Sequence, residues 1–142
     1  MYKIIIVSLI LLSAACSGTN DNQVLEEGFP QTWKLVQVNA GMSGVIYNED
    51  NLPWEENLIL NEGNTFNRTR IVENLTLNAS GEFRFLEVNN ETQLLLAHDE
   101  SSQLVENCSR DKDEILRVIS FNQLSGGSLP CDGPGLLYRR IQ

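Results

Sequence analysis

Basic residues are scarce in this 142-residue chain, which has 10 lysines and arginines against 19 aspartates and glutamates and a formal net charge of −9 at pH 7. The longest basic run is the pair Arg139-Arg140. Because a surface of this sign repels phosphate backbones, we expect no nucleic-acid partner. The acidic residues are scattered in short groups such as Glu55-Glu56 and residues 111–114, and we interpret them as a solvated surface.

Histidine occurs once, at His98, and the three cysteines form no CxxC pair. We therefore predict no zinc or other metal site and no cofactor. The chain also lacks HExxH, GxSxG and phosphate-cradling glycine motifs. Residues 98–102 contain the residue types of a catalytic triad, but triad members meet in space rather than in sequence, so we interpret this segment as a polar turn after a strand. The chain is predicted not to be an enzyme.

Long hydrophobic runs are missing as well, and the apolar residues 4–12 are too few to span a bilayer as a helix. Lys3 before this run and the small residues 13–15 after it give the layout of a cleaved secretory signal. Small residues directly before Cys16 resemble the lipobox of bacterial lipoproteins, in which the cysteine is acylated and begins the mature chain. The resemblance implies a signal peptide over 1–15 and a membrane anchor at Cys16. An ordinary cleaved signal, with an incidental cysteine, is the alternative.

Residues 17–23 contain no apolar side chain that could pack, so ordering them would cost conformational entropy without burial. We predict a flexible tether over 16–28 and a single folded domain over 29–142. With Cys16 assigned to the lipid, Cys108 and Cys131 are left as a pair. In an oxidising compartment such a pair is predicted to form a disulfide.

The remaining chain consists of short segments in which apolar and polar residues alternate, and it shows no apolar stripe of helical period. We predict an all-β fold, an antiparallel up-and-down barrel of about eight strands, with a β-sandwich as the alternative. The expected strands cover residues 32–38, 58–60, 65–72, 73–78, 83–87, 92–97, 115–121 and 135–141, with turns at 61–64, 78–81 and 89–90.

Three segments together resemble the lipocalin-like lipoproteins of bacterial envelopes. They are the opening strand 32–36 with Trp33, the hairpin 58–66, and the closing segment 130–135 before Tyr138-Arg139. The resemblance implies a β-barrel or calyx in the bacterial envelope, often of unassigned function, with Trp33 packed across its closed end. It implies no particular ligand.

The long connection 39–57 holds Met42, Tyr47 and Trp54 among polar residues. In a calyx it would lie over the open end, and long loops of this kind are often functional. We predict these three side chains as ligand contacts, Trp54 first. The alternative for Trp54 is that it folds back and caps the core.

These observations lead to a lipoprotein anchored at Cys16, with the outer membrane as the expected location. The first hypothesis is that its barrel binds a small apolar or amphipathic molecule. The second is a non-enzymatic interaction module that docks on another envelope protein through residues 39–57 or an exposed sheet face. An enzyme that acts on envelope polymers is a minor third hypothesis.

Overall fold

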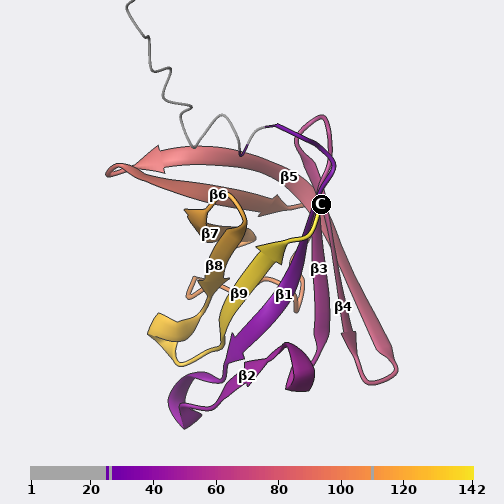
Figure 1. Ribbon diagram of the computed structural model, residues 1–142, viewed down its shortest axis with the longest axis vertical. Helices are drawn as coiled ribbons and strands as arrows, with labels where there is room; N and C mark the ends of the chain where they lie inside the picture. Colours follow the sequence, from indigo (N-terminus) through magenta and orange to yellow (C-terminus); the bar gives the residue numbers. More distant parts are fainter. Residues whose placement is uncertain (1–24, 26, 110) are drawn as a thin grey trace, which may run out of the picture.

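The computed structural model describes residue 25 and residues 27–109 and 111–142. In this part the chain forms nine strands and three short 3-10 helices (Figure 1), which confirms the predicted all-β class. The predicted signal peptide and Cys16 lie outside the described residues. The strands are β1 (Gln31–Asn39), β2 (Ile46–Asn48), β3 (Glu55–Leu60), β4 (Thr65–Val72), β5 (Leu75–Val88), β6 (Glu91–His98), β7 (Asp113–Ser120), β8 (Gln123–Gly127) and β9 (Gly135–Arg140), and the helices are η1 (Gly41–Ser43), η2 (Glu49–Asn51) and η3 (Leu129–Cys131).

Eight of these strands form a closed antiparallel barrel. β1 is followed around the ring by β3 to β9 in chain order, and β9 pairs with β1. The closing pairs run from Trp33 and Arg140 to Asn39 and Gly135. Closure removes the free edges that an open sheet of short strands would present. The barrel confirms the predicted up-and-down topology and is compatible with a lipocalin-like fold.

The barrel has two ends with different connections. At the N-terminal end, β1 begins, β9 finishes, and the turns 61–64, 89–90 and 121–122 join neighbouring strands. At the opposite end lie the connection 40–54 with β2, the turn 73–74 between β4 and β5, and the β6–β7 and β8–β9 connections. In Figure 1 the chain ends toward the top of the view, and β2 lies toward the bottom.

Bulky side chains fill the barrel interior. Trp33, Phe66 and Tyr138 come from three different strands, and each is at most 1 % exposed. The indole N–H of Trp33 donates to the Gln31 side chain (3.2 Å), whose amide donates to the carbonyl of Leu25 (2.5 Å). Leu25 is itself buried in the core cluster. The opening tryptophan is therefore a core residue, as predicted, and it helps to hold the segment before β1 against the barrel.

The turn predicted over residues 78–81 is wrong, because β5 passes through it as one continuous strand. The first part of β5 pairs with β4, and the part from Gly81 onward also pairs with β6. A Cβ at Gly81 would overlap the carbonyl oxygen of Ala97 on β6. This glycine serves a close approach of two backbones rather than a turn.

Candidate functional site

Charged side chains occupy the inside of the barrel at the end opposite its N-terminal end. Glu56 follows the same inward alternation as Leu58 on β3, and Arg68 and Arg70 follow that of Phe66 on β4. Further members come from β6, β7, β9 and the connections between strands. We refer to the following set as the ion cluster: Trp54, Glu56, Arg68, Arg70, His98, Glu106, Glu114 and Tyr138.

Arg68 is the centre of the ion cluster and is completely buried. Its Nε donates to Glu56 Oε1 and its Nη1 to Glu114 Oε2, both at 2.5 Å. Nη1 also donates to the carbonyl of Leu104 (2.8 Å), and Nη2 donates to the hydroxyl of Tyr138 (2.6 Å). One guanidinium therefore links three strands and the β6–β7 connection.

Arg70 lies one inward position beyond Arg68 on β4, farther from the N-terminal end, and it connects the carboxylate of Glu56 to Trp54. Its Nε donates to Glu56 Oε2 (2.5 Å), and its guanidinium carbon lies 4.6 Å from the centre of the Trp54 ring. The indole N–H of Trp54 donates to the same oxygen of Glu56 (3.2 Å). Stacking of a guanidinium on an indole face is favourable. Trp54 thus folds back onto the barrel end, which is the alternative that the sequence left open for it.

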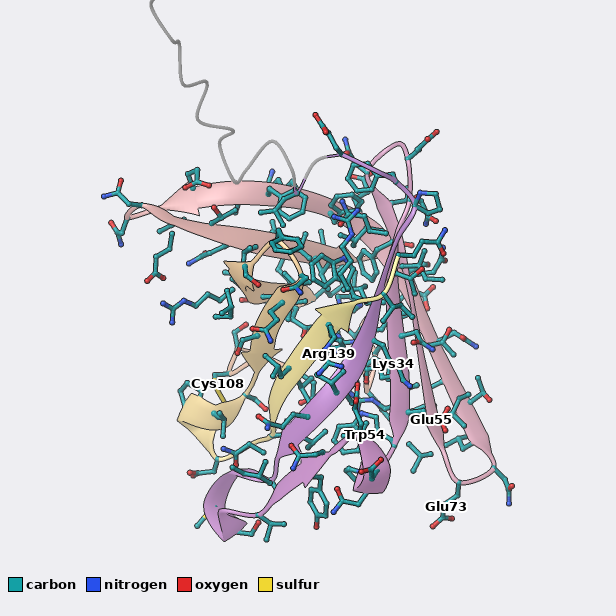
Figure 2. All side chains as sticks on the ribbon, viewed as in Figure 1. Lys34, Trp54, Glu55, Glu73, Cys108 and Arg139 are labelled. Atoms are coloured by element: carbon teal, nitrogen blue, oxygen red, sulfur yellow. A yellow bond between two sulfur atoms is a disulfide. The ribbon has the colours of Figure 1, made fainter. Side chains whose placement is uncertain are left out.

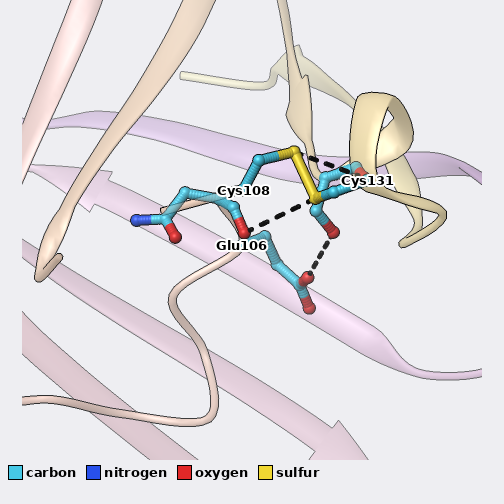
Figure 3. The surroundings of a disulfide bond; sticks show 5 residues. Glu106, Cys108 and Cys131 are labelled. Carbon is cyan, nitrogen blue, oxygen red and sulfur yellow. Dashed lines mark hydrogen bonds between the residues drawn. A yellow bond between two sulfur atoms is a disulfide. The ribbon is translucent and has the colours of Figure 1, made fainter. Parts of the chain in front are cut away.

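The β6–β7 connection closes over the ion cluster. Leu104 is fully buried there, and Glu106 accepts a hydrogen bond from Arg70 Nη1 (3.2 Å). The other oxygen of Glu106 accepts from the hydroxyl of Ser128 (3.3 Å). Beside it the predicted disulfide joins Cys108 to Cys131, with Cα atoms 5.6 Å apart (Figure 3). The disulfide prediction is confirmed, and the crosslink ties this connection to η3.

Burial and charge act in opposite directions on the carboxylates of the cluster. Burial alone would raise the pKa of Glu56, but the charges of Arg68 and Arg70 and the hydrogen bond from Tyr138 outweigh it, so that its pKa lies below the ordinary value. For Glu106 burial dominates over the attraction of Arg70, and its pKa is raised. Burial also raises the pKa of Tyr138 well above its ordinary value. Glu56 therefore stays ionised between its arginines, whereas the fold disfavours the charged form of Glu106.

The guanidinium groups of Arg68 and Arg70 already form ion pairs with carboxylates of the same chain. We therefore interpret the ion cluster as a structural element that closes this end of the barrel. Three buried atoms of the described residues have no hydrogen-bond partner, namely Arg70 Nη2, His98 Nδ1 and Glu114 Oε1. The hydroxyl of Tyr138 donates to Glu56 Oε1 (2.5 Å), so this carboxylate has a further partner besides the two arginines. Among the residues described here, none form a His, Cys, Asp and Glu group that could hold a metal ion.

The raised pKa of Glu106 predicts how a neutral substitution changes stability with pH. Because its folded-state pKa lies above the unfolded one, the stability linked to its protonation is present at low pH and is lost as the pH rises through the raised value. We expect Glu106→Gln to gain stability relative to the wild type as the pH rises from 4 to about 7. Urea unfolding at several pH values measures this, with Glu62→Gln at an exposed turn as the charge control. A difference that stays constant with pH would contradict the prediction.

The three residues predicted as ligand contacts have different surroundings in the structure. Met42 lies in η1 and is 83 % exposed, whereas Tyr47 on β2 is partly buried against the core. Trp54 belongs to the ion cluster, and Figure 2 shows it and Cys108 toward the same end of the barrel. Met42 is therefore exposed, whereas Tyr47 and Trp54 each pack against the core.

Several acidic residues were interpreted as surface residues, and for two of them this is wrong. Glu56 and Glu114 are at most 1 % exposed, because inward positions of β3 and β7 point them at Arg68. His98 was expected in a polar turn, but it is the last residue of β6 and is buried with its Nε2 3.4 Å from Glu114. The sequence did contain an indication of the ion cluster. Glu56 lies two positions before Leu58 on β3, and Arg68 lies two positions after Phe66 on β4, so both charged residues share the inward face of their strands.

Two larger pockets of the described residues lie outside the ion cluster. One, of about 360 Å³, is lined mainly by polar groups of residues 78–80 and 99–102, with Ala79 among them. The other, of about 350 Å³, lies at the N-terminal end and mixes apolar and polar groups. We call the second one the end pocket. Its lining is Leu25, Asn90, Glu91, Thr92, Arg117, Val118, Ile119, Ser120 and Phe121.

Comparison with protein-family models, curated proteins and solved structures gave no match to this chain. Within the described part of the chain there is no helix long and apolar enough to cross a membrane.

Proposed function

We propose that this chain is a lipoprotein of a bacterial envelope, anchored in the outer membrane through Cys16, and that its barrel domain binds a small amphipathic molecule without catalysing a reaction. The end pocket carries this proposal. Its volume is near the lower limit of typical small-molecule sites, about 300 Å³. Ile119 and Phe121 supply apolar surface, and the ion pair of Arg117 with Glu91 (3.0 Å) supplies a polar edge. Such a lining suits a ligand with one apolar and one polar part.

The filled interior favours this outer pocket over a hollow calyx as the ligand site. Trp33 and Phe66 fill the interior toward the N-terminal end, and the ion cluster, which includes Tyr138, fills the opposite end. A ligand inside the barrel would have to displace these packed and charged groups. A ligand in the end pocket needs no such rearrangement.

Native mass spectrometry of the acylated protein, purified from its own membrane in mild detergent, tests the proposal. We expect an excess mass that disappears on denaturation, and binding of dodecylphosphocholine supplied below its micelle concentration. Phe121→Ser should weaken dodecylphosphocholine binding at least about tenfold, since it removes a large apolar contact of the end pocket. Met42→Ser, at the opposite end, is the matched control and should bind as the wild type does. If the purified protein carries no excess mass and also does not bind dodecylphosphocholine, the proposal is refuted.

A second candidate, docking on another envelope protein, is favoured by β2. Within the described residues β2 pairs with β1 alone, so its other edge has no strand partner. Val45, just before β2, and Ile46, its first residue, are both exposed. An extended segment of a partner could add to this edge as a further strand. A photo-crosslinking residue at position 46 should then capture one partner in cells, and the same residue at position 119 should not. Capture from both positions, or from neither, would exclude this edge as the docking site.

A further inference from the structure

We propose that the N-terminal end of the barrel rests on the surface of the membrane that holds the anchor, and that the end pocket takes a lipid of that membrane. This inference rests on the anchor and the pocket of the proposed function and names the ligand class. Its occupant is the lipid bilayer itself, and three features of the chain support it.

The first feature is an apolar rim around the N-terminal end. Large apolar side chains are exposed where three separate segments reach this end, although such side chains are usually buried. Phe121 is 57 % exposed in the turn between β7 and β8, and Ile141 is 59 % exposed after β9. Val88 at the end of β5 and Ile119 near the end of β7 are exposed as well. We call these four residues the apolar rim.

The second feature is the length of chain before the first described residue. Leu25 is buried at the N-terminal end, and Cys16 precedes it by nine residues, which can span at most about 30 Å. The eight residues of β7 extend over about 26 Å, so placing the opposite end at the membrane would take nearly the full extended length of this segment. An acylated Cys16 therefore brings the apolar rim to the membrane more readily than it brings β2.

The third feature is the continuity of the rim with the end pocket. Ile119 and Phe121 belong to both, and Leu25 lines the pocket beside the point where the chain leaves the barrel. The end pocket therefore has apolar side chains of the rim in its own lining, next to the proposed membrane contact. The net charge of −9 gives no attraction to anionic lipids, so this contact depends on apolar burial and should depend little on salt.

Fluorescence quenching by brominated lipids in nanodiscs tests this orientation. The acylated mature protein is inserted into nanodiscs of phosphatidylethanolamine and phosphatidylglycerol, with intact mass confirming the acyl chains. Phe121→Trp and Met42→Trp are compared, each after subtraction of the parent emission from Trp33 and Trp54. We expect bromolipids to quench the added emission by more than half for Phe121→Trp and by less than a tenth for Met42→Trp, in both low and high salt.

Equal quenching of the two variants, no quenching of Phe121→Trp, or a protein that carries no acyl chain would overturn the inference. Circular dichroism checks that both variants keep the β-barrel. The result is separable from the proposed function through dodecylphosphocholine binding. If the soluble amphiphile binds through Phe121 but the bilayer does not quench that position, the inference fails and the binding function stands. If Phe121→Trp is quenched and no amphiphile binds, the membrane contact stands and the binding function fails.

Discussion

Arg68→Ala is expected to lower the free energy of unfolding by about 3–5 kcal/mol, because it removes the cation from between two buried carboxylates. Glu56 keeps Arg70 as a partner, but Glu114 would retain only His98. The loss also leaves the carbonyl of Leu104 and the hydroxyl of Tyr138 without their shared donor. Urea unfolding of the oxidised protein at pH 7 measures the change.

Two variants control this expectation. Arg117→Ala breaks the exposed ion pair with Glu91 and should cost less than about 1 kcal/mol. Adding Glu114→Gln to Arg68→Ala removes the uncompensated charge and should restore part of the lost stability. If Arg68→Ala costs no more than Arg117→Ala, the ion cluster does not hold the barrel end together.

The pH dependence of the same variant follows from Glu56. Its folded-state pKa lies below the ordinary value of 4.5, so its contribution to stability is present above that value and is lost as the pH falls through the lowered one. Without Arg68 the pKa of Glu56 should rise, since the largest attractive charge is gone. We therefore expect the stability gap between the wild type and Arg68→Ala to narrow below pH 4.

The alternation of side chains made the barrel predictable, and the same alternation explains what was missed. Strands with apolar residues at every second position, such as β1 and β3, stand out in sequence. The segment of β8 carries one buried leucine and two glycines, and that of β2 is three residues long, so neither gave a pattern. Gly81 was interpreted through local turn chemistry, whereas its role depends on Ala97, sixteen residues later.

The ion cluster could not be assembled from sequence because its contacts are far apart along the chain. Arg68 meets Glu114 across 46 positions and Tyr138 across 70. Local patterns indicate only that Glu56 and Arg68 face inward, which conflicts with the usual exposure of charged residues. Closure of the barrel resolves the conflict, because it brings opposite charges from different strands together.

Replacing both Cys108 and Cys131 with serine is expected to lower the free energy of unfolding by about 3 kcal/mol. The two cysteines are 23 positions apart, and the chain-entropy model assigns about this value to a closed loop of that length. Thiol titration of the denatured, unreduced wild type should find neither cysteine free, and reduction of the wild type should reproduce the unfolding midpoint of the double variant. The crosslink lies next to the contacts of Glu106 with Arg70 and Ser128, so hydrogen exchange should rise most in the β6–β7 connection. If hydrogen exchange in the β6–β7 connection is unchanged but the unfolding midpoint is lower, the disulfide acts on the unfolded chain alone. If the unfolding midpoint is unchanged, the disulfide stabilises neither the chain nor the closure over the ion cluster.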